Sequence, residues 1–131
     1  MQLNAHQGLA ALVIDTLDPL MDVEVVSPSG GPRLMVRSVP VGRDVYLFAV
    51  PAGTYCVTRF KYGTLSLSGP NGVVGCFTVR AGQLGYSGTL APRVEDGKPV
   101  THQVQDLPGF RTLLEQQYPE VARQFPASSG P

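Results

Sequence analysis

The sequence predicts an all-β protein, a single β-sandwich of two sheets with a short helix at its C-terminal end. Three observations support this prediction. The chain contains 15 glycines and 12 prolines without low-complexity repeats, a composition that indicates many turns between short strands. Up to nine short apolar or alternating segments recur at a spacing of roughly ten residues. The tail then changes to the period of a helix. At 131 residues the chain is long enough for one domain with a substantial core.

The expected strands are short and follow one another along the whole chain. Residues 9–14 form a near-continuous apolar run of a length that suits a buried strand, and residues 21–26 alternate between apolar and acidic side chains. Residues 45–50 are apolar on both sides, which predicts a central or doubly covered strand. The remaining strands are expected at residues 33–39, 55–58, 65–68, 76–80, 84–90 and 100–104.

The two cysteines occupy the same phase of two of these strands. After the turn at residues 50–53, Tyr55 points to one side and Cys56 to the other; Cys76 and Phe77 alternate in the same way. If the two strands pair in register, a Cys56–Cys76 disulfide is geometrically reasonable. The pattern therefore favours an oxidising compartment over two reduced thiols.

The sequence around these cysteines resembles a family of small bacterial envelope proteins of unknown function. The segment VPAGTY (residues 50–55) is followed by CFTVRAGQLGYSG (residues 76–88), in which Phe77, Val79, Gly82, Tyr86 and Gly88 match the family's strand-pair pattern. The clear match covers residues 50–88 and a looser one extends from about 8 to 125. The resemblance implies a prealbumin-like, or carboxypeptidase-regulatory-like, sandwich of the Ig-like two-sheet kind in the cell envelope, and no chemistry. Many relatives look like lipoproteins, but no lipobox is visible here.

The expected organisation is one domain over residues 8–125, with a flexible N-terminus at 1–7 and a disordered tail at 126–131. A helix is predicted at about 109–125, because Phe110, Leu114 and Tyr118 belong to one apolar stripe. Pro119 predicts a kink or restart of the helix at Tyr118-Pro119. The family that the sequence resembles often closes with a short helix carrying the same Tyr-Pro pair. The helix is expected to pack across an open end of the sandwich; a partner-binding helix is the alternative.

Export is expected from the cysteines and from the family resemblance. No apolar run is long enough to span a membrane. We expect that Met1 stands where an export signal has been removed, so the predicted location is the periplasm or cell envelope, with no lipid anchor visible.

The charges are balanced in total but unevenly distributed. The net charge is zero, yet residues 32–93 hold seven basic residues against one acidic residue, a balance of +6. Neutralisation between neighbouring strands is the favoured interpretation. The alternative is a basic surface for an acidic protein partner. The candidate partner surface consists of Arg33, Arg37, Arg80 and Tyr62.

No catalytic, cofactor or metal site is predicted. The two histidines are too few for a zinc site, and the spacing of Asp15, Asp18 and Asp22 misses that of a calcium loop. Ser87 lacks the setting of a nucleophile. Residues 59–62 interleave basic and aromatic residues, but zero net charge argues against nucleic acid.

Arg59 departs from the alternation, which places it on the core side with Tyr55 and Val57. Either the strand ends or bulges there, or Arg59 is partly buried against a carboxylate such as Asp44. The strand end is the favoured interpretation.

These observations favour a non-enzymatic, exported binding module of the bacterial periplasm that contacts another protein. One alternative is an immunity protein that neutralises a secreted toxin. A second is a carbohydrate-binding sandwich, which exposed rings at Tyr62 and Tyr86 would favour. A hydrolase is disfavoured, since the sequence shows no cluster of a catalytic acid, a base and a nucleophile.

Overall fold

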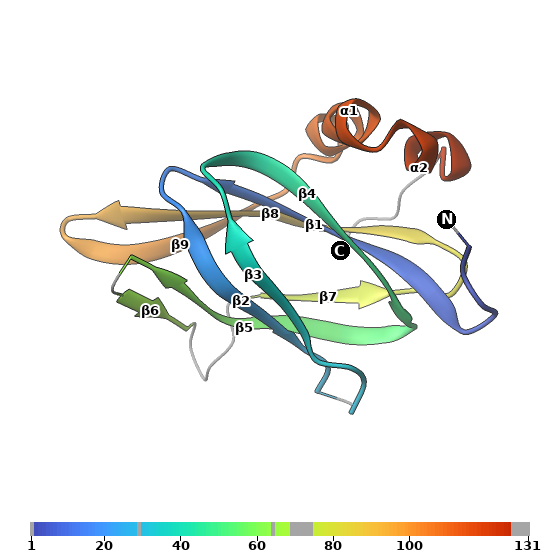
Figure 1. Cartoon of the computed structure of the whole chain (residues 1–131), viewed down its shortest axis with the longest axis horizontal. Helices are drawn as coiled ribbons and strands as arrows, with labels where there is room; N and C mark the ends of the chain where they lie inside the picture. Colours follow the sequence, from blue (N-terminus) through green and yellow to red (C-terminus); the bar gives the residue numbers. More distant parts are fainter. Residues whose placement is uncertain (1, 29, 64, 69–74, 127–131) are drawn as a thin grey trace.

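The computed structural model describes residues 2–28, 30–63, 65–68 and 75–126. Each predicted strand is present in these residues, followed by two short helices (Figure 1). The elements are β1 (Gln7–Thr16), β2 (Leu20–Val26), β3 (Leu34–Val39), β4 (Gly42–Pro51), β5 (Gly53–Tyr62), β6 (Leu65–Leu67), β7 (Gly75–Val79), β8 (Leu84–Glu95), β9 (Lys98–Val104), α1 (Leu107–Gln117) and α2 (Pro119–Gln124).

The strands form two sheets that face each other. Sheet A has the order β4-β1-β8-β9, and sheet B the order β3-β2-β5-β6, with β7 also paired to β5. Within them β1 and β8 are parallel, while the other pairs are antiparallel. The mostly β prediction with two sheets is confirmed at this level.

Strand β1 is covered on both faces, which explains its continuous apolar run. Its even-numbered residues, Leu12 among them, face sheet B and join the core between the sheets. Its odd-numbered residues, such as Leu9 and Val13, face the other way and join a second core under the helices. Since alternate side chains of a strand point to opposite faces, two separate cores require apolar residues at every position.

The prediction of a central or doubly covered strand at residues 45–50 is half right. Strand β4 is an edge strand of sheet A, paired with β1. Both of its faces are nevertheless partly covered: Val50 belongs to the core between the sheets, and Val45 to the core under the helices. A continuous apolar run therefore indicates that both faces of a strand are covered. It does not indicate whether the strand has a neighbour on each side within the sheet.

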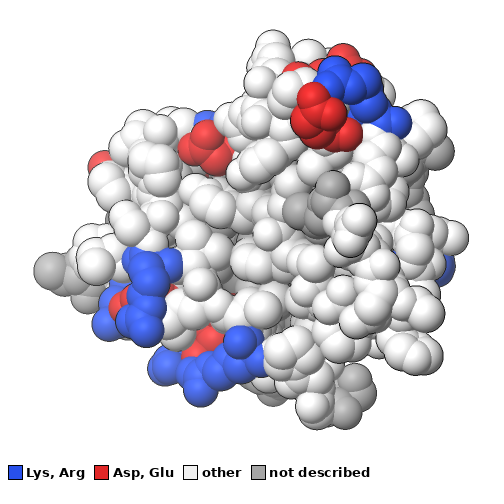
Figure 2. Space-filling view, turned by 45° about the vertical axis from the view of Figure 1, so that its right-hand side comes forward, with Lys and Arg blue, Asp and Glu red and all other residues white. Residues whose placement is uncertain are grey.

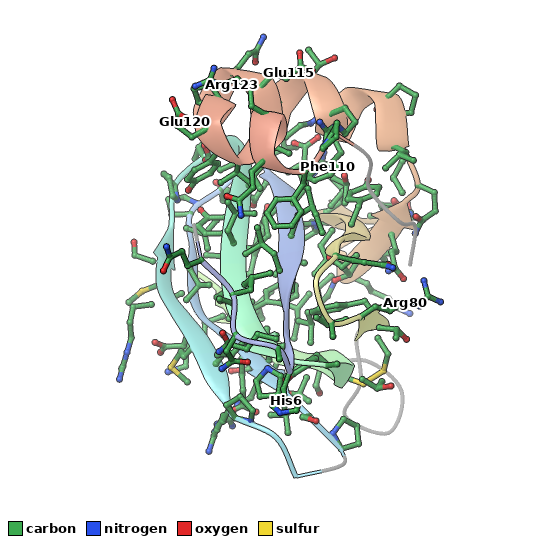
Figure 3. The ribbon with its side chains drawn as sticks, turned by 90° about the vertical axis from the view of Figure 1, so that its right-hand side faces the viewer. His6, Arg80, Phe110, Glu115, Glu120 and Arg123 are labelled. Carbon is green, nitrogen blue, oxygen red and sulfur yellow. A yellow bond between two sulfur atoms is a disulfide. The ribbon has the colours of Figure 1, made fainter. Side chains whose placement is uncertain are left out.

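The helices pack on the outer face of sheet A, away from sheet B, and the prediction that they cross an open end of the sandwich is wrong (Figure 1). The Asp106 side chain accepts a hydrogen bond from the Gly109 N–H at 3.0 Å, which caps α1 at its start. The ring of Phe110 stacks on that of Tyr86 from β8, with centroids 4.7 Å apart. Figure 3 shows Phe110 below the helices, with Glu115 and Glu120 on their solvent side. As predicted, the helical segment breaks at Tyr118-Pro119. No helix in the described part of the chain is long and apolar enough to cross a membrane.

The segment before β1 makes contacts with the body of the protein. Leu3 packs against the core under the helices, and the His6 carbonyl accepts a hydrogen bond from the Ala52 N–H at 2.9 Å. The prediction of a disordered tail concerns residues 126–131, of which only Pro126 lies within the described residues.

Candidate interaction surface

Within the part of the chain that the structure describes, the outer face of sheet B carries four basic side chains and is not covered by a helix. We call Arg33, Arg37, Arg59 and Lys61 the cationic face. They come from the loop before β3, from β3 and from β5, and all four are exposed. Figure 2 shows basic side chains at the left and lower left of the molecule with acidic ones among them, and a further group of both kinds at the upper right. This contrasts with the outer face of sheet A, which α1 and α2 cover.

Two bulges between β2 and β5 turn Arg59 toward solvent. The register shifts between Met21 and Glu24 and shifts back before Val25, so one extra residue lies on each strand. Asp22, on β2, adopts the left-handed conformation with a φ of 52°. The favoured prediction that the strand ends at Arg59 is wrong, because β5 continues to Tyr62. The alternative of a bulge at this point is confirmed. Partial burial of Arg59 against a carboxylate such as Asp44 is wrong, because Arg59 is exposed and pairs with Glu24.

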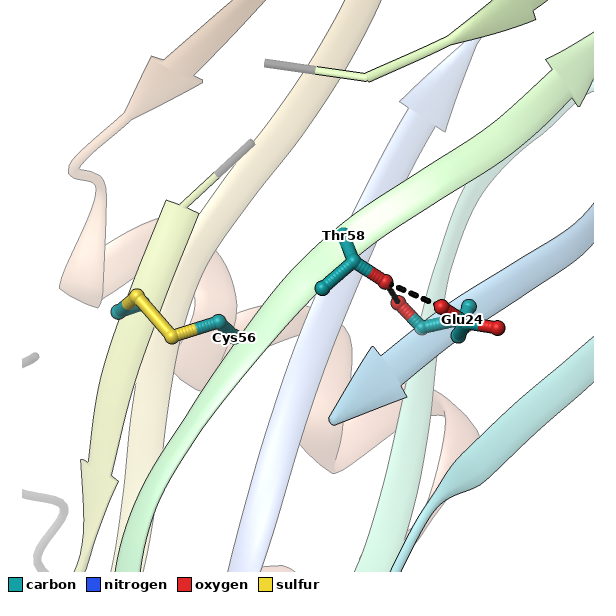
Figure 4. Close-up of a disulfide and its surroundings, with 4 residues drawn as sticks. Glu24, Cys56 and Thr58 are labelled. Carbon is teal, nitrogen blue, oxygen red and sulfur yellow. Dashed lines mark hydrogen bonds between the residues drawn. A yellow bond between two sulfur atoms is a disulfide. The ribbon is translucent and has the colours of Figure 1, made fainter. Parts of the chain in front are cut away.

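Glu24 lies at the centre of the cationic face and is nearly buried, its side chain being 9% exposed. The Thr58 hydroxyl donates to its Oε1 at 2.7 Å (Figure 4), and Arg59 contacts its Oε2 at 3.3 Å. Arg33 donates a further hydrogen bond to Oε2. The hydrogen bonds from Thr58 and Arg33 hold the pKa of the Glu24 carboxyl below its ordinary value, and they outweigh the opposing effect of burial.

Arg37 is the basic side chain of this face that has no ion pair among the described residues. Glu24 pairs with Arg33 and Arg59, and Asp22 pairs with Lys61 at 3.4 Å. Arg37 has no ion pair or hydrogen bond with any residue that the structure describes. Four basic and two acidic side chains leave a balance of two positive charges. This surface is therefore partly neutralised internally and still positive.

A hollow of about 230 Å³ lies next to Arg37 on this face. It is lined by Asp22, Met35, Arg37, Arg59, Phe60, Lys61 and Ser66. Its volume is below the ~300–1,000 Å³ that is usual for small-molecule sites. Its size and its three cations suit one acidic side chain or another small anion.

The structure brings some of the predicted surface residues together and leaves others apart. Arg33 and Arg37 lie on the cationic face. Arg80 follows β7, which β5 and β2 separate from β3, and it points outward in Figure 3. Tyr62, at the end of β5, donates a hydrogen bond to Asp18 Oδ2 at 2.6 Å, which together with partial burial raises its pKa.

Sequence reasoning missed Glu24, Arg59 and Lys61 as parts of this surface. Strict alternation placed Arg59 on the core side, and the strand end was favoured over the bulge that turns it outward. Glu24 was interpreted only as one of the acidic residues that alternate with apolar ones over residues 21–26, since its pairing to β5 is not visible along the chain. The sequence carries one weak sign of the bulge. Position 22 has a positive φ, and it is occupied by aspartate, one of the few non-glycine residues that tolerate this conformation.

The Cys56–Cys76 disulfide is confirmed. The two residues lie directly opposite each other on β5 and β7, with their Cα atoms 4.0 Å apart (Figure 4). Cys56 is buried and Cys76 is exposed. The bridge crosses the outer face of sheet B and ties β7 to the strand that carries Thr58 and Arg59.

The other residues that were considered for chemistry have structural partners. Asp15 pairs with Arg43 at 3.0 Å, and Asp18 and Asp22 are held by Tyr62 and Lys61. Ser87 is buried in β8, where its hydroxyl donates to the Ala11 carbonyl at 2.9 Å. Within the described residues, no three His, Cys, Asp or Glu side chains are grouped as a metal site requires.

Comparisons with known proteins give no family for this chain. No family model and no curated protein matches it. Among solved structures it is similar to a leucine-rich repeat protein from Bacteroides thetaiotaomicron VPI-5482, with 14% sequence identity and a TM-score of 0.46. That similarity covers 67% of this chain and 14% of the other. A likeness this distant carries no conclusion about fold or function.

Proposed function

We propose that this protein is a non-enzymatic, exported binding module with a prealbumin-like, Ig-like sandwich, and that its cationic face binds an acidic protein partner. The observation that carries the proposal is Arg37. It is an exposed arginine without a partner among the described residues, beside a hollow that two further cations line. Arginine at the centre of an interface often contributes much of the binding energy.

The form of this surface favours a protein over other ligands. The hollow is too small for a typical small-molecule site, while the surrounding strands offer a broad face for contact. Acidic residues interleave with the basic ones, and the net charge of the chain is zero, which disfavours a polyanion such as nucleic acid.

The alternatives differ in how much support they have. An immunity protein would use the same surface, with a secreted toxin as the acidic partner. The carbohydrate-binding alternative depended on exposed rings at Tyr62 and Tyr86. Tyr86 is 1% exposed and stacked on Phe110, and Tyr62 is half-buried against the core with its hydroxyl bonded to Asp18. The feature that would favour a sugar is therefore missing from these two residues.

An exported location is supported by the disulfide, because such bridges persist mainly in oxidising compartments. The family resemblance of residues 50–88 points to the bacterial envelope as well.

The test compares Arg37→Glu with Arg80→Glu as a matched control. Both arginines are exposed, and neither side chain has a partner among the described residues, but only Arg37 lies on the cationic face. Capture from a bacterial envelope extract, with the unchanged protein and both variants in parallel, identifies candidate partners. We expect an acidic protein that is retained by Arg80→Glu and lost with Arg37→Glu.

Binding kinetics with that partner then complete the test. Arg37→Glu should slow association about tenfold or more at low salt, and the difference should shrink as salt rises. Equal association rates for the two variants would show that the cationic face does not bind the partner.

A further inference from the structure

The outer edge of β4 presents backbone groups that face away from the sheet. In sheet A, β4 pairs with β1, and none of the described strands lies on its other side. The Val45 N–H points away from β1, to the side chain of Gln117. The Ala52 N–H points the other way and bonds to the carbonyl of His6, the residue that precedes β1. Because the backbone of a paired strand alternates, the odd-numbered residues of β4 direct their N–H and C=O groups outward.

Both ends of this edge are closed. At one end Gln117 Oε1 accepts the Val45 N–H at 2.9 Å, and its amide nitrogen lies 3.5 Å from the Arg43 carbonyl. At the other end Pro51 has no N–H to offer. Between them, the peptide groups of Leu47 and Ala49 have no hydrogen-bond partner on the outer side among the residues that the structure describes.

The open part of the edge lacks the usual protection against pairing. Residues 45–50 read VYLFAV, without a charge, a proline or a shift of register against β1. Natural edge strands are generally shielded by such features, and an apolar, β-prone edge without them is a pairing site. Ala49 is exposed, and the rings of Tyr46 and Phe48 are half-buried beside the core.

We propose that β4 pairs antiparallel with β4 of a second copy of this chain, about a two-fold axis at Phe48. In this register Leu47 of each copy faces Ala49 of the other. The N–H and C=O groups of these two residues then form hydrogen bonds across the axis in both directions. Sheet A becomes continuous through both copies.

The closed ends match the same register. Two residues beyond the paired positions, Val45 of one copy faces Pro51 of the other. The Val45 N–H is engaged by Gln117 and the Pro51 carbonyl accepts the Tyr55 hydroxyl at 2.7 Å, so these two positions take no part in the pairing, which is confined to Leu47 and Ala49. The free backbone groups are thus complementary to themselves, as a two-fold interface requires. If β4 instead bound an unrelated extended peptide, its free backbone groups would not need to be complementary to themselves.

The side chains add to the pairing. The axis places the Phe48 rings of the two copies opposite each other in a non-hydrogen-bonded pair, where side chains approach most closely. Tyr46 of each copy lies across from Val50 of the other. The cationic face belongs to the outer face of sheet B, so both copies keep it free for a partner.

The oligomeric state of the purified full chain tests this proposal. Sedimentation should show a dimer that forms between low micromolar and near-millimolar concentration. Amide hydrogen exchange should slow about tenfold or more at Leu47 and Ala49 on dimerisation. Ala49→Lys places a charge in the pairing edge and Ala49→Pro removes one of the free N–H groups, so each should weaken association about tenfold or more. Thr54→Lys, a matched change at an exposed position of β5 in sheet B, should leave association unaltered.

A protein that stays monomeric across this range would overturn the proposal. So would a dimer in which the Leu47 and Ala49 amides remain unprotected, or one that Ala49→Lys leaves intact. If Ala49→Pro fails to fold, the lysine variant and the exchange measurement on the unchanged protein still decide the question.

Discussion

Glu24 on β2 lies directly opposite Arg59 on β5, and a bulge on each strand flanks this pair. The carboxylate is nearly buried, whereas the guanidinium is 61% exposed. An acid at the base of a cationic surface holds the arginines in place and offsets part of their repulsion. It also makes the stability of sheet B sensitive to acid.

The first prediction concerns Glu24 and pH. The fold lowers the pKa of its carboxyl below 4.5, the ordinary value for glutamate, so the ionised form stabilises the folded state. This contribution is present above the ordinary value and is lost as the pH falls from there through the folded pKa. Glu24→Gln should lower the free energy of unfolding at neutral pH by about 1–3 kcal/mol, because hydrogen bonds to a charged group are lost.

Chemical denaturation at a series of pH values checks this. The unchanged protein should lose stability on acidification below 4.5, and Glu24→Gln should lose less over the same interval. Glu115→Gln, on the exposed side of α1, is the control and should follow the unchanged protein. Identical acid dependence in all three proteins would contradict the assigned role of Glu24.

The second prediction concerns the bulge at Asp22. Its φ of 52° is strained for most side chains, least for asparagine and aspartate, and most for β-branched residues. Asp22→Val should therefore cost about 1–2 kcal/mol of unfolding free energy, whereas Asp22→Asn should cost little. Both changes remove the ion pair with Lys61, which as an exposed pair contributes little and cancels in the comparison. Equal stability of the two variants would mean that the left-handed conformation is not needed.

The sequence was sufficient for the features that depend on local pattern. The strand positions, the disulfide phase of Cys56 and Cys76, and the helix break before Pro119 each follow from a short periodicity or from one residue's covalent geometry. Tertiary structure agreed with these local preferences, so the predictions were confirmed.

The features that depend on strand order could not be predicted in this way. Arg80 was grouped with Arg33 and Arg37 because the three lie in one basic stretch, but β5 and β2 separate their strands. The direction of Arg59 depends on bulges that compensate each other across two strands distant in sequence. The edge position of β4 depends on which strand lies next to it, and hydrophobicity along the chain does not encode this.

The third prediction concerns the disulfide. Twenty residues separate Cys56 from Cys76, and closing a loop of this size should stabilise the fold by about 3 kcal/mol, mainly by restricting the unfolded chain. The double variant Cys56→Ala, Cys76→Ala should lose about that much in chemical denaturation. Intact-mass analysis of alkylated, denatured and non-reduced protein should find no free thiol. Two labelled cysteines in protein freshly isolated from an oxidising compartment would refute the bridge and remove the support it gives to export.

The last prediction concerns Gln117, whose side-chain amide lies against the edge of β4 like a short piece of strand. Its oxygen accepts the Val45 N–H at 2.9 Å, and its nitrogen donates to Asp44 Oδ1 at 3.0 Å. Gln117→Ala should lower the free energy of unfolding by about 1–2 kcal/mol, because the N–H of the buried Val45 loses its partner. Gln117→Glu should be worse at neutral pH, since its carboxylate cannot donate and meets the carboxylate of Asp44. Gln116→Ala is the matched control, because Gln116 is exposed and has no partner among the described residues. Thermal and chemical unfolding of the four proteins measure these differences. If the alanine variants at 116 and 117 proved equally stable, the amide of Gln117 would not be what closes this end of β4.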